Sequence, residues 1–585
     1  MMDPPMMPES SLITPYGGEL VDLLVSDERR AELRARSRDW PSWGLTPRQL
    51  CDVELLLSGA FSPLRGFMGR EDHERVLSDM RLASGVLWPL PVTLDVSEAL
   101  AASLEPGGRL ALRDPEGLMV AVLEVSDIFR PDRAREAAQT LGTADLEHPG
   151  ARHLLQEAGP VCVGGRLEGI ELPVHYDFRL LRYTPRELRA EFVKRGWRRV
   201  LAYQTRNPVH RPHHAITMRA ARERQANLLL HPAVGETQPG DVDIFTRVRS
   251  YQAVLPRYPK HTVMLSLLQL AMRMAGPREA LLHAIVRRNH GCTHFIVGRD
   301  QAGPEPRRSG EPFYEPFAAQ ALALEHADEL GIEIVPVGEM VYHRDLDEYD
   351  YADAAPAGAA TLPVSGSEVR RRLAAGRSIP PWMSFPEVVR ELKRTYRPRH
   401  QQGFTVLFTG LSGAGKSTLA NVLQVRLLEM GGRPVTLLDG DIVRRNLSSE
   451  LTFSREHRDI NIRRIGFVAS EITKNGGIAI CAPIAPYDRV RREVRRMVSE
   501  RGGFVLVHVS TPLDVCEARD RKGIYAKARA GLVKEFTGIS DPYEEPGDAE
   551  IVIDTSEATP DQCTQQVLLY LEKEGFITGA RDNGS

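Results

Sequence analysis

One segment of the sequence, residues 204–214, combines residue types that suit the binding of a metal or of anions. It is QTRNPVHRPHH, with three histidines, two arginines and two prolines within eleven residues. Histidines at short spacing are typical of metal sites, but a metal shell also needs carboxylates or thiolates, and arginines repel a cation. Histidines with a structural role are a second interpretation. The arginines favour a third, a cradle for a tetrahedral oxyanion and a polyphosphate, because a guanidinium donates two hydrogen bonds to such anions.

A second segment, FTVLFTGLSGAGKSTLANVLQVRLL, has the spacing of a phosphate-binding loop. An apolar strand over 404–409 leads into Gly410-x-x-x-x-Gly415-Lys416-Ser417 and then directly into a helix. The glycines let consecutive backbone N–H groups point at one anion, and the helix N-terminus adds a partial positive charge. We expect Lys416 to reach the outer phosphates of a nucleotide and the Ser417 hydroxyl to bind Mg²⁺.

Charged residues after this loop are candidates for binding a second substrate. Asp439 and Asp441 follow the next expected strand, where carboxylates can hold hydrated Mg²⁺ or accept a proton from a hydroxyl. Arg458 and Asn461 share one face of a later expected helix, although a solvated basic face is the alternative interpretation of such a run. Residues 521–546 are rich in cations and interrupted by glycines, a composition typical of a mobile lid.

The segments GLSGAGKST, DGDIVR, NIRRIG and KGIYAKARAGLVKEFTG resemble the adenylylsulfate (APS) kinase family over most of residues 403–575. That family uses ATP and Mg²⁺ to phosphorylate the 3'-hydroxyl of APS. The resemblance implies an ATP site at Gly410, Gly413, Gly415, Lys416, Ser417 and Thr418, with Mg²⁺ on Ser417. It implies an APS site at Asp439, Arg444, Phe453, Arg458, Asn461, Lys522 and Phe536. Asp441 is then the candidate for orienting or deprotonating the 3'-hydroxyl.

The chain departs from that family at one position. Many members carry an SPYR-type segment whose serine has been discussed as a phosphate acceptor. Here the segment is APYD, with Ala485 and Asp488. A phosphoserine cannot form at this position, so direct in-line transfer is the favoured mechanism.

QTRNPVHRPH and VGRDQAGP (297–304) are similar to the sulfate- and ATP-binding signatures of the ATP sulfurylase family, within the nucleotidylyltransferase superfamily. FSPLRGFM (61–68), HPG (148–150), EMVY (339–342) and residues 364–388 also resemble that family, which extends the resemblance over roughly residues 10–395. The implied catalytic residues are Thr205, Arg206, Asn207 and His210. The implied ligands of sulfate and ATP are Gln204, Arg206, His210, His213, Gly298, Arg299, Ala302 and Val341.

That family's reaction is attack of sulfate on the α-phosphorus of ATP, which gives APS and pyrophosphate. Sulfate is fully ionised at pH 7, so the reaction needs no general base, and catalysis comes from in-line positioning and charge stabilisation. Many relatives have GRDHAGP where this chain has Gln301, and glutamine carries no charge, so we expect its phosphate contact to differ. We expect His214 to be structural.

The expected secondary structure places both candidate segments of the first half at equivalent positions. From about residue 184, expected helices over 184–197, 261–274, 278–291 and 315–330 alternate with strands over 198–205, 292–297 and 332–337. This alternation predicts a parallel, doubly wound α/β sheet, in which ligands bind beyond the carboxyl ends of the strands. Residues 204–214 and 298–304 both follow such strand ends.

The amino-terminal region has a different pattern. β-like runs over 88–96, 109–114 and 119–129 are separated by glycine and proline, which indicates a β-rich domain. No catalytic motif lies in it, so packing or positioning is its expected role.

Composition excludes some classes of protein. The chain of 585 residues is too long for one core, and its net charge of -3 gives no general argument for nucleic-acid or membrane binding. The six cysteines are scattered without a CxxC pair, as in reduced intracellular proteins. The amino terminus lacks a signal-peptide pattern, and the longest apolar stretch, over 263–272, is too short to span a membrane. We therefore expect a cytoplasmic protein.

Together these observations predict a multidomain α/β chain. We expect a β-rich PUA-like domain over 1–168, and a Rossmann-like nucleotidylyltransferase domain over 169–393 with a small subdomain from about residue 340. A basic linker over 394–402 then leads to a P-loop kinase domain with a parallel sheet over 403–575, and residues 576–585 form a disordered tail.

The resemblances imply a bifunctional enzyme that makes APS in its first half and phosphorylates it to 3'-phosphoadenylylsulfate (PAPS) in its second. Its substrates are ATP, sulfate and APS, its cofactor is Mg²⁺ with ATP, and we expect a homo-oligomer, a dimer or larger. One alternative is a kinase-like domain that only senses PAPS, which the intact phosphate loop disfavours. A second is a sulfurylase that runs in reverse to make ATP, which an attached kinase disfavours because it would drain APS.

Overall fold

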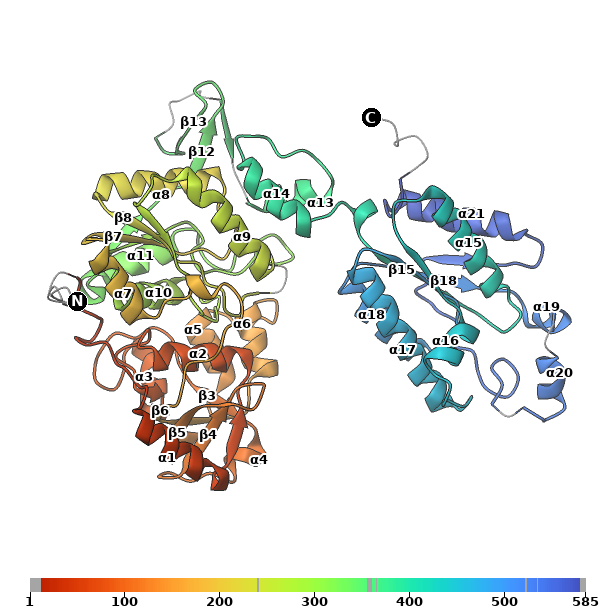
Figure 1. Cartoon of the computed structure of the whole chain (residues 1–585), viewed down its shortest axis with the longest axis horizontal. Helices are drawn as coiled ribbons and strands as arrows, with labels where there is room; N and C mark the ends of the chain where they lie inside the picture. Colours follow the sequence, from red (N-terminus) through yellow and green to blue (C-terminus); the bar gives the residue numbers. More distant parts are fainter. Residues whose placement is uncertain are drawn as a thin grey trace, which may run out of the picture. The chain divides into compact units, whose positions relative to one another are not determined.

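The computed structural model describes residues 12–238, 241–354, 360–363, 366–520, 523–533 and 535–578. The chain divides into two compact units, Met1–Val369 with Ile379–Thr395, and Arg370–Ser378 with Tyr396–Ser585. Three sheets belong to the first unit and one to the second (Figure 1). All six cysteines are free and buried, and no helix in the described ranges is long and apolar enough to cross a membrane.

The amino-terminal sheet of the first unit has the order β1-β4-β5-β6-β2, with β3 paired to β6. Every pair except β1 with β4 is antiparallel. The strands are β1 (Ser42–Gly44), β2 (Gly66–Phe67), β3 (Leu94–Val96), β4 (Arg109–Arg113), β5 (Met119–Phe129) and β6 (Val161–Gly169). The helices of this region are α1 (Asp27–Arg36), α2 (Pro47–Leu57), α3 (Arg70–Asp79), α4 (Glu98–Ala101), α5 (Arg133–Leu141) and α6 (Pro149–Arg152). The strand predicted over 88–96 is confirmed only for 94–96, because Pro89 and Pro91 have no N–H to donate.

The central sheet is parallel throughout, with the order β11-β10-β7-β8-β9, as the helix–strand alternation predicted. Its strands are β7 (Val200–Tyr203), β8 (Asn227–Leu230), β9 (Val263–Leu265), β10 (His294–Val297) and β11 (Glu333–Pro336). The helices around it are α7 (Pro185–Lys194), α8 (Arg211–Arg224), α9 (Ile244–Val254), α10 (Pro277–Asn289), α11 (Ala318–Glu325) and α12 (Ala327–Leu330). One buried apolar cluster contains Leu110 of the first sheet and Phe295 of this one, so the two regions share a core.

The helix predicted over 261–274 is wrong. Residues 263–265 form β9, which pairs in parallel with β8, and residues 266–276 form a loop. A short continuous apolar run fits a buried strand as well as a buried helix, and here pairing with β8 decided the outcome. The resulting loop, which we call the methionine loop (residues 268–276), passes beside the anion-binding segment described below.

The first unit ends in a small antiparallel sheet and a long helix. The sheet has the order β13-β12-β14, formed by β12 (Met340–His343), β13 (Glu348–Tyr351) and β14 (Thr361–Pro363). Two helices follow it in the chain, α13 (Gly366–Ala374) and α14 (Pro386–Thr395). Because α14 continues to Thr395, the first two residues of the predicted linker are helical.

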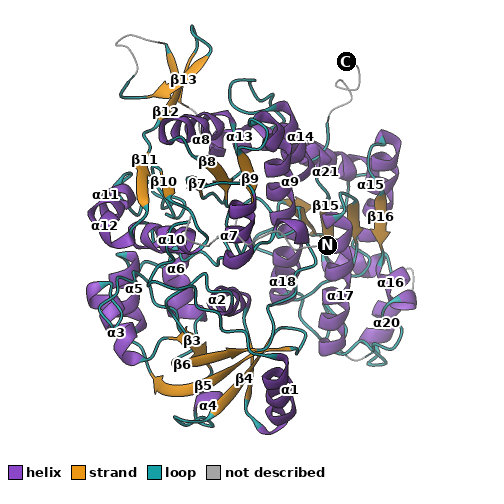
Figure 2. Cartoon of the chain, turned by 60° about the vertical axis from the view of Figure 1, so that its left-hand side comes forward, coloured by secondary structure: helices purple, strands orange, loops and turns teal. Residues whose placement is uncertain are grey.

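The second unit contains a five-stranded parallel sheet with the order β16-β17-β15-β18-β19. Figure 2 labels β15 and β16 of this sheet. Its strands are β15 (Phe404–Thr409), β16 (Val435–Leu438), β17 (Ile478–Cys481), β18 (Gly503–Val509) and β19 (Ile551–Ile553). Its helices are α15 (Lys416–Met430), α16 (Gly440–Asn446), α17 (Arg455–Lys474), α18 (Asp488–Ser499), α19 (Leu513–Ala518), α20 (Ile524–Arg529) and α21 (Pro560–Lys573). Separate apolar clusters join the sheet to α15 with α21 and to α17 with α18.

The predicted disordered tail begins too early. Phe576 is only 2% exposed, its ring centroid lies 5.1 Å from that of Phe404, and Arg399 stacks on it at 4.2 Å. Apolar burial therefore orders the chain beyond residue 575, whereas residues 579–585 lie outside the described ranges.

This packing gives a stability prediction. Phe576→Ala removes a fully buried ring, which costs about 3 to 5 kcal/mol in typical cores. Calorimetry of the full chain should show one unfolding transition moved to lower temperature. Leu569→Ala is the matched control, because Leu569 lies on α21 and is 55% exposed. Equal stability of the two variants would contradict the role assigned to Phe576.

Candidate functional sites

The anion-binding segment predicted at residues 204–214 follows the central strand β7 and leads into α8. β7 lies between β10 and β8, so this loop and the loop after β10 emerge at the same edge of the sheet. α8 begins at Arg211 with a proline in its first turn, and His210 is its N-cap. The geometry therefore points backbone N–H groups of a helix start toward this edge.

Gln204 and Gln301 join the two loops. The Gln301 side-chain amide donates to Gln204 Oε1 at 2.7 Å, and the Gly298 N–H donates to Gln301 Oε1 at 3.4 Å. Gln204 is 6% exposed, so this contact fixes its buried amide. Gln301, which stands where many ATP sulfurylases have a histidine, thus forms a hydrogen bond to the neighbouring loop.

Arg206 forms one long ion pair and otherwise contacts a weak acceptor. Its side chain is 12% exposed, and it pairs with buried Asp241, whose Oδ2 lies 3.8 Å from Nε. Arg206 Nη1 instead contacts the sulfur of Met274 at 2.8 Å, and Gln204 Nε2 contacts that of Met272 at 3.8 Å. Thioether sulfurs are weak acceptors, so an incoming oxyanion can outcompete them.

The backbone of this segment is also fixed. The Thr205 hydroxyl donates to the Asn207 carbonyl and accepts from the Asn207 N–H, both at 3.0 Å. Tyr251 donates to the same carbonyl at 3.1 Å. Buried Arg247 donates to the carbonyls of Arg206 and Ala233, both at 3.1 Å. Thr205 and Asn207, predicted to be catalytic, therefore shape the loop through the backbone.

Two of the three histidines in this segment, His210 and His213, have defined hydrogen-bond roles in the local structure. The His210 N–H donates to His213 Nδ1 at 3.1 Å, so the proton of the neutral His213 ring is on Nε2. Burial lowers the pKa of His213 to about 4, which keeps this ring neutral at pH 7. His210 Nδ1 lies 2.8 Å from the Ser384 hydroxyl. His213 can therefore serve a phosphate as a hydrogen-bond donor and not as a cation.

His214 has the structural environment that the sequence predicted. Its ring lies 4.4 Å from that of Tyr258 and 5.4 Å from that of Phe385, and its Nε2 lies 3.2 Å from the Arg257 carbonyl. Burial is the main cause that lowers its pKa.

The second predicted loop contributes Arg299 and Ala302. Arg299 is 43% exposed and pairs with Glu339 at 2.9 Å and Asp300 at 3.2 Å. Ala302 has a φ of +57° and is buried, and its carbonyl accepts from the Gly276 N–H at 3.2 Å. Val341 lies on β12 and is 9% exposed.

In the second unit, the phosphate loop joins β15 to α15 as the spacing predicted. Gly410, Gly413 and Gly415 have φ values of +149°, +77° and +102°, a region that L side chains rarely adopt. A side chain at Gly410 would also lie 2.4 Å from the Val509 carbonyl oxygen. The loop therefore needs glycine at these positions for its conformation as well as for access by an anion.

Lys416 is buried and tethered to this loop. Its Nζ donates to the carbonyls of Gly410 at 2.9 Å and Leu411 at 2.7 Å, and the residue is 7% exposed. Burial lowers the pKa of Lys416 to about 8, with nearby Cys516 and Asp439 acting in the opposite direction. A bound phosphate would supply the compensating charge that this position lacks.

Oxygen ligands suited to Mg²⁺ lie beside the loop. The Ser417 hydroxyl donates to Asp439 Oδ2 at 2.8 Å, which places a hydroxyl and a carboxylate together as such sites require. Thr418 follows in α15. Asp441 lies in α16, and its side chain is outside the described set. Among the described residues, no group of three histidine, cysteine or carboxylate side chains forms a metal site.

The residues predicted to hold APS fall into two groups. Arg444 stacks on the ring of Phe453 at 4.1 Å, and that ring is 66% exposed. Arg458 on α17 is 9% exposed, donates to Thr537 at 2.7 Å and pairs with Asp541 at 2.9 Å. Asn461, one turn further on α17, is 5% exposed, and its Oδ1 has no hydrogen-bond partner within the described ranges. A buried polar atom without a partner suggests that a ligand satisfies it.

The predicted lid lies against the phosphate loop. The ring of Phe536 packs on that of Tyr525 at 5.0 Å, and the Tyr525 hydroxyl donates to the Ser412 carbonyl at 2.8 Å. Thr537, next in the chain, is the partner of Arg458. Phe536 is therefore close to both the phosphate loop and Arg458, whereas Lys522 lies outside the described residues.

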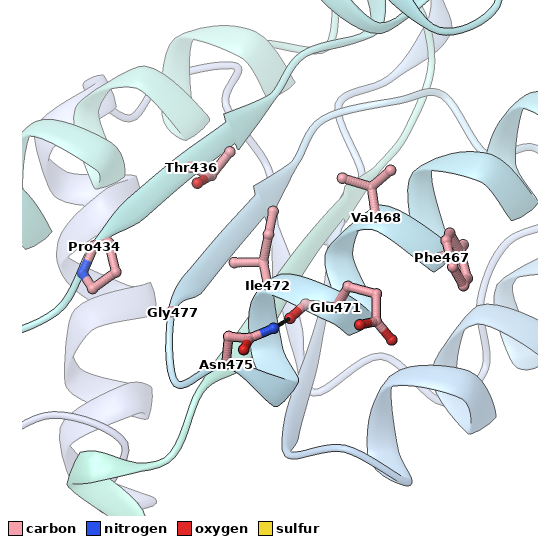
Figure 3. Close-up of a pocket in the computed structure, with 8 residues that line it drawn as sticks. All are labelled: Pro434, Thr436, Phe467, Val468, Glu471, Ile472, Asn475 and Gly477. Carbon is pink, nitrogen blue, oxygen red and sulfur yellow. Dashed lines mark hydrogen bonds between the residues drawn. The ribbon is translucent and has the colours of Figure 1, made fainter.

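A groove of about 450 Å³ lies elsewhere on the second unit, between α17 and the edge strand β16 (Figure 3). Its lining residues are Pro434, Thr436, Phe467, Val468, Glu471, Ile472, Asn475 and Gly477. None of the predicted site residues lines it, so it is separate from the chemistry described above.

Sequence patterns missed several residues that complete these sites. Met272, Met274, Asp241 and Arg247 contact Gln204 or Arg206, but they lie outside the quoted motifs and carry no periodic or spacing signal. Asp541 binds Arg458 from a loop 83 residues away in the sequence and accepts from Tyr487 at 2.6 Å. Such long-range partners become visible only in the folded chain.

Comparison with known proteins agrees with the architecture. Family models match in chain order: a PUA-like domain over residues 13–172, ATP-sulfurylase over 179–395 and adenylylsulphate kinase over 402–554. Proteins named sulfate adenylyltransferase from Neosartorya fischeri and Neurospora crassa are 52% and 51% identical, with 96% of this chain and 99% of each relative covered. A solved structure titled hexameric APS kinase from Thiobacillus denitrificans is 45% identical at a TM-score of 0.80, covering 97% of this chain and 100% of that one.

The lowered pKa of Lys416 gives a pH prediction. The pKa of Lys416 is about 8 in the free protein, and bound phosphates should raise it because they favour the charged form. Nucleotide binding above about pH 8 should therefore take up a proton. Affinity at the phosphate loop should therefore fall as the pH rises from about 8 to 9, and should be flat below that range. Titration calorimetry with ATP in buffers of different ionisation enthalpy measures this uptake. The control is Lys416→Met, and equal uptake in both proteins would refute the assignment.

Proposed function

This chain belongs to the sulfate adenylyltransferase family and carries an adenylylsulfate kinase domain, and on that premise we propose how its two sites make PAPS. The first site joins ATP and sulfate to give APS and pyrophosphate. The second uses another ATP to phosphorylate the 3'-hydroxyl of APS. The observation that carries this function is the presence of both domains in one chain, each with its anion-binding loop at the carboxyl end of a parallel strand.

In the first site, Gln204, Arg206 and the Ala302 backbone bind sulfate. The support is a guanidinium of a side chain that is 12% exposed, which has a long ion pair with Asp241 and a weak sulfur acceptor, beside the buried amide of Gln204. His210, His213 and Arg299 face the phosphates of ATP, with Thr205 and Asn207 holding the loop and Gly298 and Val341 bordering the nucleotide. The reaction then needs only in-line placement of sulfate and stabilisation of charge on the phosphorane and on pyrophosphate.

In the second site, Gly410, Gly413, Gly415, Lys416 and Thr418 bind the ATP phosphates. Ser417 and Asp439 hold Mg²⁺, which when bound neutralises charge on the β- and γ-phosphates. Lys416 leaves its two carbonyl partners to reach the phosphates. Asp441 orients the 3'-hydroxyl for in-line attack, since Ala485 and Asp488 offer no phosphoserine.

APS binds the second site on residues supplied by α16, α17, the segments that precede these two helices, and the lid. These are Asp439, Arg444, Phe453, Arg458, Asn461, Lys522 and Phe536. The support is the unpartnered Oδ1 of Asn461 beside the buried guanidinium of Arg458. We also propose that the domain boundaries are those the sequence predicted, apart from the corrections at 394–395 and 576.

We further propose that the chain forms a homo-oligomer. The support is the 45% identical structure with the same domains, which its title describes as hexameric. The alternative, a kinase-like domain that only senses PAPS, is not favoured because the glycines, Lys416 and Ser417 of the phosphate loop are all present in a loop of the required conformation.

A single assay tests the two-site assignment. The purified chain is incubated with ATP, Mg²⁺ and labelled sulfate, and the labelled nucleotides are resolved. Arg206→Ala should lower formation of APS at least 100-fold, the usual effect of losing a charge-stabilising donor. Lys416→Ala should leave the initial rate of APS formation unchanged and abolish PAPS.

The matched controls use added APS. Arg206→Ala should still convert APS and ATP to PAPS at the normal rate, because the kinase site is unchanged. Arg206→Lys keeps the charge but loses the paired N–H groups, so it should recover only part of the sulfurylase activity. Loss of both activities in either single variant would contradict two independent sites.

The unpartnered Oδ1 of Asn461 gives a prediction that is specific to APS binding. Asn461→Ala should raise the KM for APS at least tenfold and leave the KM for ATP within twofold. The variant should unfold at the same temperature as the parent or higher, because it removes a buried side-chain oxygen that makes no hydrogen bond within the described ranges. A lower unfolding temperature with unchanged KM for APS would show that Asn461 is structural.

A further inference from the structure

The amino-terminal sheet domain has no catalytic motif, yet it contacts the methionine loop (residues 268–276) at three successive residues. Arg48 on α2 donates to the Met272 carbonyl at 3.0 Å. Asp52, one turn further on α2, accepts two hydrogen bonds from Arg273 at 2.7 and 2.8 Å. His148 Nε2, at the start of α6, lies 3.2 Å from the Met274 carbonyl.

The contact of His148 has a defined direction. The N–H groups of Gly150 and Ala151 donate to His148 Nδ1 at 3.1 and 3.4 Å, so the proton of the neutral ring is on Nε2. Burial lowers the pKa of His148 to about 4, which is consistent with a neutral ring at pH 7. His148 Nε2–H therefore donates to the Met274 carbonyl at 3.2 Å or to the Tyr314 hydroxyl at 3.1 Å, and that hydroxyl also lies 3.2 Å from the Met274 carbonyl. A side chain at Gly150 would lie 2.5 Å from the Arg273 carbonyl oxygen, so the two backbones are in close contact.

The pair of Asp52 and Arg273 is the strongest of these contacts. It is bidentate, and the side chains are only 6% and 11% exposed. The loop is also anchored from α10, where Glu279 accepts from the N–H groups of Arg273 and Ala275, both at 2.9 Å. Breaking one partner of a buried charge pair is costly, so this geometry is strongly held.

The other side of the methionine loop faces the proposed sulfate ligands. Met274 Sδ contacts Arg206 Nη1 at 2.8 Å, and Met272 Sδ contacts Gln204 Nε2 at 3.8 Å. Met274 has a φ of +59°, a conformation that bulky residues rarely adopt without surrounding support. Anchors on residues 272, 273 and 274 therefore set where the two sulfurs, and with them the two sulfate ligands, lie.

We propose that Arg48, Asp52 and His148 are positioning residues for sulfate, through which the amino-terminal domain sets the affinity of the adenylyl-transfer site. This inference rests on the proposed binding of sulfate by Gln204 and Arg206. It gives the amino-terminal domain a role in the first reaction and none in the kinase reaction. Sulfate affinity should respond to these residues more than ATP affinity does, because the loop contacts the sulfate ligands.

The test is Asp52→Asn in the full chain, with sulfurylase kinetics measured against both substrates. Asp52→Asn should raise the KM for sulfate at least tenfold and change the KM for ATP less than twofold. Asp52→Glu, which restores the carboxylate, should recover most of the sulfate affinity. Conversion of added APS to PAPS should be unchanged in both variants.

Glu136→Gln is the matched control. Glu136 is 5% exposed and pairs with Arg133 at 2.8 Å and with His73 at 3.5 Å, all within the amino-terminal sheet domain. Its KM for sulfate should stay within twofold of the parent. An equal rise in the KM values for sulfate and ATP, or an equal effect of Glu136→Gln, would overturn the proposal.

Met274→Leu keeps the test decisive if Asp52→Asn does not fold. It preserves volume, which cores tolerate well, and replaces the sulfur against Arg206. Without the sulfur that orients the Arg206 guanidinium in the free site, the KM for sulfate should rise several-fold with the KM for ATP unchanged, and no change would overturn the proposal. Arg206→Ala distinguishes failure of the proposed function from failure of the positioning role. An unchanged KM for sulfate in this variant would refute the proposed function. A large rise in the KM for sulfate in Arg206→Ala, with no rise in Asp52→Asn or Met274→Leu, would refute only the positioning role.

Discussion

Two anions that repel each other must be held in contact, and the rest of this structure depends on that constraint. Sulfate carries two charges and the ATP triphosphate more, and unit charges 4 Å apart repel by about 4 kcal/mol at an effective dielectric constant of 20. Fixed donors have to overcome this repulsion. In the first unit, we propose that they come from two loops at one edge of the parallel sheet, which a hydrogen bond from Gln301 to Gln204 joins.

Burial lowers the pKa of His213 and of Lys416, two residues of the proposed anion sites, with different results. It keeps His213 neutral and fixes its proton on Nε2, so the ring is a donor of one defined direction. It lowers the pKa of Lys416 and leaves Arg206 with sulfur atoms as close contacts. In both proposed sites a cation, Arg206 or Lys416, has partners that a bound anion would supplement or replace. Preorganised donors of this kind need little rearrangement when charge develops.

The pairing of the two domains also has a thermodynamic reason. The phosphosulfate anhydride of APS is rich in free energy, so its formation from ATP and sulfate is unfavourable by itself. A kinase that consumes APS, together with removal of pyrophosphate, draws the first reaction forward. The chain supplies that second step from its own second unit, with a phosphate loop of the required backbone conformation.

The sequence by itself determined the elements whose signals are local. Glycine spacing predicted the phosphate loop, helix–strand alternation predicted the parallel sheets, and short motifs predicted the loops that carry Gln204, Arg206 and His210. Prediction from the sequence failed where burial and strand pairing decide the structure. The apolar run over residues 261–274 contributes to β9 and the methionine loop, and Phe576 is buried in the core of the second unit. Only the tertiary structure placed Asp52 and His148 against the methionine loop and Met274 against Arg206, because residues far apart in sequence meet through packing that no spacing pattern records.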